Sequence, residues 1–430
     1  MYYPPIENNF WRQVLSQFEK ISSEKIVYAL LFLLPIFAVT VRHWVSNIFG
    51  VLALLSLVLL YLQRKERTEL LKEEKILLWG FAVYFGVFIL TSVVNGWGPL
   101  QTRYLGVEIR FLLFVPIYLA IRQMNYSAKW LLWGAVLAVI FTFYDAARDI
   151  FSLNVDVYRG AYSPLLTGPI ILMFTALLAP YFYAKTSSVW QKLLLLLIVC
   201  LAFFVVSQTG ARNAYLTAIV FCALFIVHQY KGIKRYVSIG AALLLIIGAY
   251  LFIDTVNERI NLAYKEFTEY SAYKEPAKVT AALSSVGVRL EMWRATPIFF
   301  KHNPLFGVSR GNYSTDIKKY IKNGLLHQDV GRHAHPHNVY SETIISKGLI
   351  GLVSLLWITV IPLIILVNGY HKGLRTAFYG VVLISGYMVL SLTDASTFIK
   401  GNYSALYVVL LAVLFSFYIQ EKQKLDIKSE

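Results

Sequence analysis

Charge and cysteine are both scarce in this sequence, and each scarcity excludes a class of protein. Only 15% of the 430 residues are charged, whereas 57% are hydrophobic. A soluble globular protein must cover itself with polar surface. This composition therefore excludes a soluble globular protein and makes lipid the expected solvent. The two cysteines, Cys200 and Cys222, both lie inside apolar runs, so they indicate neither a disulfide framework nor a zinc site.

The first 24 residues lack the hydrophobic core of a secretory signal peptide. Their apolar residues recur instead at helical spacing, at Trp11, Val14, Leu15, Phe18 and Ile21. This pattern favours a short cytoplasmic helix over residues 1–24 that lies on the membrane surface.

Long apolar runs are abundant in the rest of the chain. A helix needs about 17 to 25 residues to cross a hydrocarbon core of roughly 30 Å. Twelve runs meet this requirement: 25–41, 44–62, 76–94, 106–122, 129–147, 164–183, 190–207, 213–229, 235–253, 340–367, 375–393 and 402–420. We therefore expect an all-α integral membrane protein with nine transmembrane helices in residues 25–253 and three in residues 337–420.

The distribution of basic residues orients these spans. The formal net charge of +16 alone would also fit a nucleic-acid-binding protein. With both termini cytoplasmic, the inner loops and termini hold 20 Lys and Arg, including those of the tail at 421–430. The short outer loops then hold six: Arg42, Arg103, Arg148, Arg159, Arg212 and Lys400. Since basic residues gather on the cytoplasmic side, we expect cytoplasmic termini and no nucleic-acid partner.

One long polar segment, residues 254–336, would then lie outside the cytoplasm. It contains 12 Lys and Arg against 8 Asp and Glu. Long translocated loops are not bound by the positive-inside rule, so this excess reflects either ordinary solvated charge or an anionic ligand. We expect a mostly helical periplasmic loop here.

The long loop ends in a cluster of histidines, at positions 333, 335 and 337. Pro336 is well placed to begin the next spanning helix, which would put His337 in its first turn. A helix N-terminus disfavours the imidazolium, so this position suits a neutral histidine that acts as a general base. Two alternatives remain: the three imidazoles bind a metal, or they are polar residues at the water boundary.

Two glycines follow at helical spacing from this histidine. Gly348 and Gly351 come 11 and 14 residues after His337, which on a continuous helix places all three within about 40° of one face. Small residues on such a stripe let a neighbouring helix approach closely. We expect these glycines to pack the His337 helix in place.

Arginines at the outer helix ends or in the long loop form a second group: Arg159, Arg212, Arg289 and Arg294. The guanidinium donates paired hydrogen bonds that match phosphate oxygens, so these residues are candidates for binding a diphosphate. The alternative is that they snorkel toward lipid headgroups. Two deeper charges suggest structural pairs, Arg110 with Glu108 and Lys347 with Glu342.

The chain from residue 207 to 351 resembles the O-antigen ligase and polymerase superfamily of bacterial membrane glycosyltransferases. The ligase motif is His, then Asn, Ser or Gln, nine residues, Gly, two residues, and Gly, Thr or Tyr. It is matched here by His337-Asn338, nine residues, Gly348, two residues and Gly351. The resemblance implies that Arg212, Arg289 and His337 matter most and that no metal or nucleotide cofactor is needed.

The resemblance also implies an activity and a location. The expected enzyme is an inverting O-antigen ligase that joins a glycan from undecaprenyl diphosphate to the outer-core sugar of lipid A-core, completing lipopolysaccharide. It would act at the periplasmic face of the bacterial inner membrane. A polymerase that extends the glycan on its carrier is the nearer alternative, and a transporter or flippase with Arg110, Asp145 and Lys347 as ion-coupling residues is the other.

Overall fold

The structure, a computed structural model, describes residues 7–62, 69–124, 127–161, 163–184, 187–252 and 254–429. All regular secondary structure in these ranges is helical, which confirms the all-α prediction. The α-helices are α1 (Glu7–Thr40), α2 (Trp44–Leu62), α3 (Lys72–Val94), α4 (Pro99–Leu112), α5 (Phe114–Ile121), α6 (Ala128–Phe151), α7 (Pro164–Phe182), α8 (Val189–Thr209), α9 (Arg212–Gln229), α10 (Ile233–Phe252), α11 (Asp254–Ala272), α12 (Ser285–His302), α13 (Tyr313–Lys322), α14 (Val339–His371), α15 (Ala377–Thr393), α16 (Ser396–Ile399) and α17 (Gly401–Ser429). Two 3₁₀ helices, η1 (Pro276–Lys278) and η2 (Gln328–Arg332), complete the set.

Ten helices within the described residues are long and apolar enough to cross a membrane, so the protein is a multi-pass membrane protein. They correspond to ten of the twelve predicted spans, with α4 and α5 together forming one of them. The predicted span 375–393 is the shorter apolar helix α15, and the predicted span 25–41 lies within α1. Twelve spans are therefore not confirmed.

The first helix joins two segments that the sequence analysis separates. α1 continues without a break from Glu7 to Thr40, so the predicted boundary between residues 24 and 25 lies inside one helix. The side chains of residues 1–23 lie outside the described part of the structure. The amphipathic surface helix therefore stays a prediction.

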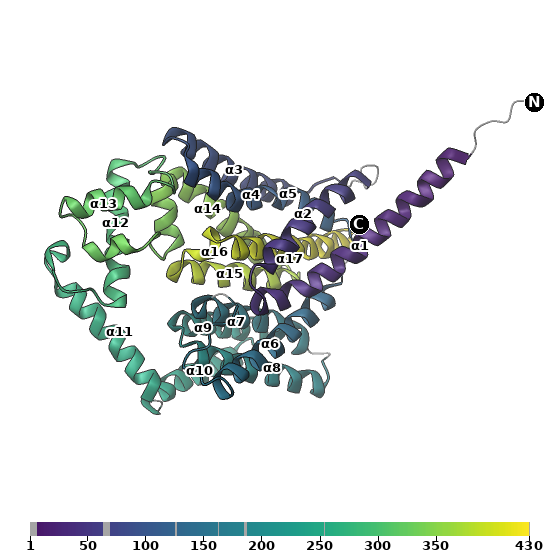
Figure 1. Ribbon diagram of the computed structural model, residues 1–430. Coiled ribbons are helices and arrows are strands. Elements are labelled where there is room, and N and C mark those ends of the chain that lie inside the picture. The colour runs from purple at the N-terminus through teal and green to yellow at the C-terminus, as the bar shows by residue number, and fades with distance from the viewer. Residues whose placement is uncertain are drawn as a thin grey trace, which may run out of the picture.

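The bundle has a buried centre formed by α17, which contacts α2, α4, α5 and α15. α14 packs between α3 and α15 on the same side. A second group, α6 to α9, gathers around the largely buried α7 and is covered by α1. Figure 1 shows these two groups, which α15 connects through its contacts with α7 and α9.

The long loop folds into α11, η1, α12, α13 and η2 at one end of the bundle, opposite the C-terminus (Figure 1). Its small core is built around Met292, Phe299, Tyr313 and Ile317. Ile345 of α14 belongs to this core, so the loop domain is anchored directly on the helix that follows the histidine cluster.

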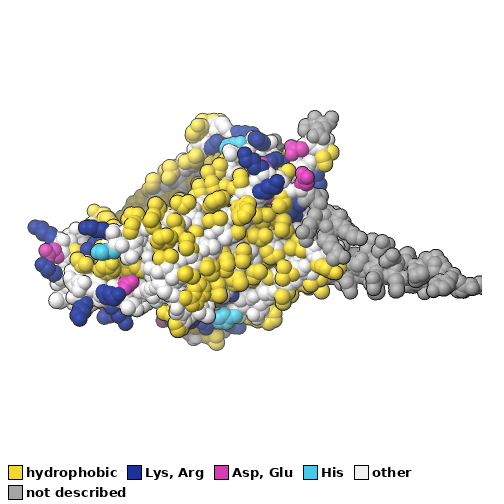
Figure 2. All heavy atoms as spheres, turned by 90° about the horizontal axis from the view of Figure 1, so that it is seen from above, with side chains coloured by type: hydrophobic (Ala, Val, Ile, Leu, Met, Phe, Trp, Pro, Cys, Tyr) yellow, Lys and Arg dark blue, Asp and Glu magenta, His cyan; other side chains and the backbone are white. Residues whose placement is uncertain are grey.

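The outer surface separates into the zones that a bilayer requires. Figure 2 shows a broad hydrophobic face between two ends where Lys, Arg, Asp and Glu gather, one of which is the loop domain. Large exposed side chains on the apolar helices include Leu54, Trp79, Trp130 and Leu196. Exposed apolar surface of this extent is stable in lipid and unstable in water.

Candidate active site

A pocket opens at the loop end of the bundle, where α9, α11, α12 and α15 meet. Its volume is about 370 Å³. Polar side chains from four separate segments line it, namely Arg212, Asn213, Arg259, Ser285, Arg289 and Thr393. Because three of these are arginines, the pocket is suited to an anion.

Arg212 enters the pocket from a sharp turn between two spanning helices. α8 is capped at its C-terminus by Gly210, whose φ of +59° is the left-handed conformation that glycine adopts at helix ends. Ala211 caps α9, so Arg212 is the first helical residue. Its Nη1 lies 3.6 Å from Oε2 of Glu266 on α11. Asn213 braces the turn by donating to the carbonyl of Leu165 at 2.7 Å.

Arg289 reaches the pocket from the second turn of α12. This helix begins at an N-cap, Ser284, whose hydroxyl accepts the N–H of Gly287 at 3.1 Å. Burial lowers the pKa of the Arg289 guanidinium, as does Arg212, whereas Asp394 and Glu266 oppose this effect. Within the described residues Arg289 has no ion-pair partner, so it presents an unneutralised cation to the pocket.

His337 lies just before α14 and not in its first turn, so that prediction is wrong. The helix begins at Val339 with Asn338 as its N-cap, and His337 has a φ of +48°. The side-chain oxygen of Asn338 accepts the N–H of Ser341 at 3.0 Å, and its nitrogen donates to the carbonyl of Leu392 at 3.1 Å. Asn338 thus accepts a free backbone N–H at the start of α14 and also connects α14 to the end of α15.

That tie brings His337 next to a carboxylate. Nδ1 of His337 lies 4.0 Å from Oδ1 of Asp394, the residue that ends α15. Asp394 is only 4% exposed, and its Oδ1 accepts the N–H of Ser396 at 2.8 Å. Nδ1 of His337 is buried and has no hydrogen-bond partner among the described residues. A short movement would form the pair that orients a catalytic imidazole.

The surroundings of His337 favour its neutral form. Burial lowers the pKa of His337, and the nearby His333, Arg289 and Lys400 lower it further, while Asp394 raises it. The net shift is downward from 6.5, so the ring is mainly neutral at pH 7 and can accept a proton. The predicted neutral state thus arises mainly from burial.

The rings of the other two histidines pack against His337, one edge-on and one tilted. The rings of His335 and His337 are 4.6 Å apart, and those of His333 and His337 are 5.4 Å apart. Burial, followed by the influence of His337, lowers the pKa of His335 to about 3. Within the described residues no group of three or more His, Cys, Asp or Glu side chains is arranged to hold a metal ion.

The pocket and the histidine are neighbours. Thr393 lines the pocket, and Asp394, the next residue, lies beside His337. Arg289 also lines the pocket and acts electrostatically on His337. A ligand whose anionic part enters the pocket would therefore hold an adjoining atom near the imidazole.

α14 is broken at Gly348, so the argument that placed His337 and the two glycines on one continuous helix face is wrong. Gly348 has φ +64° and ψ −157°, a combination that only glycine adopts readily. Chain 304–309 docks into the break: Leu349 N–H donates to Pro304 at 2.8 Å, and Val308 N–H donates to Ile345 at 2.8 Å. Gly348 therefore admits a loop and not a neighbouring helix.

Gly351 is required by the same broken turn. A Cβ at Gly351 would lie 2.2 Å from Cβ of Lys347, and one at Gly348 would lie 2.3 Å from the carbonyl oxygen of Leu305. Ser309, in the docked chain, has a φ of +63°, the left-handed conformation that glycine usually supplies. The glycines thus position the loop domain against the helix that follows His337.

Two predicted charge pairs are wrong. Lys347 donates to both carboxylate oxygens of Glu108 at 2.9 Å, and not to Glu342. Arg110 donates instead to the hydroxyl of Ser46 at 3.2 Å. Sequence spacing misled in both cases because the true partners come from other helices.

The three ion-coupling candidates of the transporter interpretation have separate surroundings. Lys347 is held by Glu108, and Arg110 lies beside Ser46. Asp145 pairs with Arg148 at 2.8 Å, within a single helix. They do not share one site, which weighs against this interpretation.

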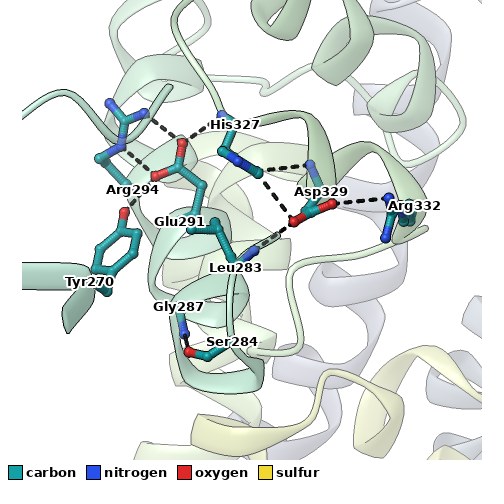
Figure 3. Close-up of polar contacts among 9 residues, drawn as sticks. All are labelled: Tyr270, Leu283, Ser284, Gly287, Glu291, Arg294, His327, Asp329 and Arg332. Atoms are coloured by element: carbon teal, nitrogen blue, oxygen red, sulfur yellow. Dashed lines mark hydrogen bonds and ion pairs between the residues drawn. The ribbon is translucent and has the colours of Figure 1, made fainter. Parts of the chain in front are cut away.

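Arg294 and Arg159 are not among the residues that line the pocket. Arg294 donates through Nε and Nη2 to Glu291 at 2.8 and 2.6 Å, and Glu291 also accepts from the hydroxyl of Tyr270 and from the N–H of His327 (Figure 3). Burial would raise the pKa of Glu291, but these hydrogen bonds outweigh it and lower the pKa. The cluster holds α11, α12 and η2 together.

Two residues of the site, Arg259 and Asp394, are not predicted from the sequence. Asp394 is the one carboxylate in the predicted outer loop between spans 375–393 and 402–420, a signal that could have been used. Arg259 lies in the long polar segment among other basic residues, and nothing local distinguishes it. Only the fold brings α11 to the pocket.

The fold and the site define a class of protein: a polytopic membrane protein with an arginine-lined pocket beside a neutral histidine. Residues 193–356 match the family described as O-antigen ligase, in agreement with the resemblance that the His-Asn motif predicts. An uncharacterized protein of Haemophilus influenzae is 23% identical over 312 residues, which cover 70% of this chain and 75% of that protein.

Proposed function

We propose that the protein is an O-antigen ligase, which transfers a glycan from undecaprenyl diphosphate to the outer-core sugar of lipid A-core. The observation that carries this proposal is the arginine-lined pocket next to His337. Thr393 lines this pocket, and the carboxylate of the following residue, Asp394, faces His337. The match of residues 193–356 to the O-antigen ligase family and the multi-pass helices support it. The site would lie at the periplasmic face of the bacterial inner membrane.

In this mechanism the donor's diphosphate occupies the pocket against Arg212 and Arg289. His337 removes the proton from the acceptor hydroxyl, and the hydroxyl oxygen bonds to the anomeric carbon as the bond from that carbon to the diphosphate oxygen breaks. The guanidinium groups stabilise the negative charge that develops on the leaving diphosphate. Asp394 stabilises the imidazolium that His337 becomes.

The step is a single displacement, so it inverts the anomeric centre. The diphosphate is itself the leaving group, and no nucleotide takes part. We expect neither a metal nor another cofactor. The acceptor and the donor are both lipid-anchored, so membrane lipids surround the reaction. Product with retained anomeric configuration would contradict this mechanism.

The test is transfer by purified protein in liposomes that contain an undecaprenyl-diphosphate glycan and lipid A-core, with a chelator present. Glycan on lipid A-core is the expected product. Longer glycans on the polyprenyl carrier alone would assign a polymerase instead. Movement of the donor across the bilayer without any transfer would assign a flippase.

A further inference from the structure

Arg259 is a third cation at the pocket that matches no part of the ligase motif. It lies on α11, and its Nη2 is 3.5 Å from the position that a Cβ of Gly210 would occupy. The guanidinium therefore packs over the turn that immediately precedes Arg212. Within the described residues Arg259 makes neither an ion pair nor a side-chain hydrogen bond, so its donors are free for a ligand.

A carboxylate on the same face of α11, Glu266, already pairs with one of the pocket arginines, Arg212. Glu266 follows Arg259 by seven residues, which is about two helical turns. Its Oε2 lies 3.6 Å from Nη1 of Arg212 and accepts the N–H of Val286 at 3.3 Å. The distance to Arg212 is long for an ion pair, so a better acceptor would displace it.

The charges around the pocket do not balance. Arg212, Arg259 and Arg289 contribute three positive charges, whereas Glu266 and Asp394 contribute two negative ones. A diphosphate presents two phosphoryl groups, and each guanidinium binds one edge of such a group through paired hydrogen bonds. Three arginines match this ligand better than the single phosphate of a common lipid headgroup.

We propose that Arg259 is a third ligand of the donor's diphosphate and that Glu266 is a place-holding carboxylate that releases Arg212 when the diphosphate enters. This inference rests on the proposed function, because it concerns the same donor. It adds a binding residue from α11 and assigns opposite effects to two residues on one helix face.

The test measures binding of farnesyl diphosphate to the purified full-length protein in detergent, without any transfer step. Arg259→Gln should raise the Kd at least about tenfold, since it removes charge-assisted hydrogen bonds. Arg259→Lys should recover part of this loss, because it keeps the charge without the planar fork. Glu266→Gln keeps an acceptor for the Val286 N–H but removes the competing charge, so the Kd should fall.

Lys265→Gln is the matched control. Lys265 is an exposed cation on the same helix, about 120° around it from Arg259, and does not line the pocket. Its loss should change the Kd by less than about twofold. Thermal unfolding of each variant verifies that the exposed Arg259 is dispensable for folding.

Binding of farnesyl monophosphate and of phosphatidylglycerol, which each carry one phosphate, distinguishes a site for the donor's diphosphate from a site for a lipid headgroup. Weaker binding of all three ligands in Arg259→Gln by the same factor would overturn the inference and make Arg259 a headgroup anchor. Unchanged farnesyl diphosphate binding in Arg259→Gln would also overturn it. Wild-type protein that binds no farnesyl diphosphate would instead contradict the proposed function, and the inference with it.

Discussion

At the scale of single residues, the proposed base is a histidine that lies beside a carboxylate at the end of another helix. Nδ1 of His337 and Oδ1 of Asp394 are 4.0 Å apart, and burial keeps the ring mainly neutral. Such a ring needs an orienting group, because a free imidazole would rotate or present the wrong tautomer. The buried Asp394 carboxylate lies where a short movement of the ring would make it that orienting group.

Asp394→Asn should change both the rate and its pH dependence. The Asp394 carboxylate raises the pKa of His337, so its loss lowers that pKa further. The acidic limb of the kcat profile, where the base becomes protonated, should therefore move to lower pH. The plateau rate should fall at least about tenfold, because orientation of the ring is lost.

The measurement is initial transfer rate in liposomes between pH 4.5 and 8. Arg148→Gln serves as the control, since Arg148 pairs with Asp145 and Asp149 on α6 and is not among the pocket residues. An acidic limb that stays in place or moves upward in Asp394→Asn would mean that Asp394 does not act on the base.

The family resemblance predicted His337, Arg212 and Arg289 as functional residues from the sequence, and the fold brings them to one end of the bundle. Arg259 and Asp394 were not predicted, because their roles depend on where α11 and the end of α15 lie. Arg294 does not line the pocket, and it is bound by Glu291, which lies one turn away on the same helix. Side-chain chemistry was readable from the sequence, but pairing between segments was not.

At the scale of helices, the break in α14 connects the loop domain to the bundle. Chain 304–309 hydrogen-bonds to the backbone exposed on either side of Gly348. Arg310 continues this contact, because it donates to the carbonyl of Ile399 at 3.0 Å and lies over the ring of Tyr104. Arg289 and His337 thus belong to segments that are fixed on one helix.

Gly348→Ala should weaken this junction. The residue would keep a backbone conformation that costs about 1–3 kcal/mol for a side chain, and its Cβ would clash with the Leu305 carbonyl. We expect a lower thermal unfolding midpoint and faster proteolysis within residues 254–336. The matched control is Gly86→Ala in α3, where nothing lies within 4 Å of the new Cβ. Equal behaviour of the two variants would contradict the proposed role of Gly348.

Glu291→Gln should destabilise the loop domain, because Glu291 is fully buried and accepts from three groups. The expected loss is about 1–3 kcal/mol at neutral pH. The pKa of Glu291 is lowered in the fold, so its contribution is complete above its ordinary value of 4.5 and is lost as the pH falls below it. The difference between wild type and variant in thermal unfolding should therefore shrink in acid. A constant difference would contradict this.

The sequence predicted most of the apolar helices but not how α14 is interrupted. Ten predicted spans coincide with apolar helices because hydropathy over about 20 residues is a strong signal. The break at Gly348 depends on chain 304–309, which is more than 30 residues away, and no periodicity reports such a contact. A helix was therefore predicted to run straight through it.

At the scale of the whole molecule, the two ends of the bundle differ in what they carry. The helices α11 to α13 lie at one end, and the C-terminus lies at the other (Figure 1). Residues of α11 and α12 line the pocket, which places it at the loop end. A lipid-linked donor and a lipid-anchored acceptor would reach the pocket from the membrane surface at the loop end. The proposed topology therefore requires the loop end to face the periplasm.

Labelling with a membrane-impermeant maleimide tests this topology. The background lacks native thiols, because Cys200 and Cys222 lie exposed on apolar helices and are replaced by serine. Lys322→Cys on α13 should react in intact spheroplasts, and Lys424→Cys near the end of α17 should react only after permeabilisation. The reverse pattern would place the pocket in the cytoplasm and contradict the proposed donor.

The central claim is that His337 is the base for glycan transfer at the pocket. Single-turnover transfer from an undecaprenyl-diphosphate glycan to lipid A-core, in liposomes with saturating substrates, measures that step alone. His337→Ala should reduce the rate about 10²- to 10⁴-fold while donor binding is retained. A rate within about threefold of wild type would contradict the claim, because a base that contributes so little to transfer is not catalytic.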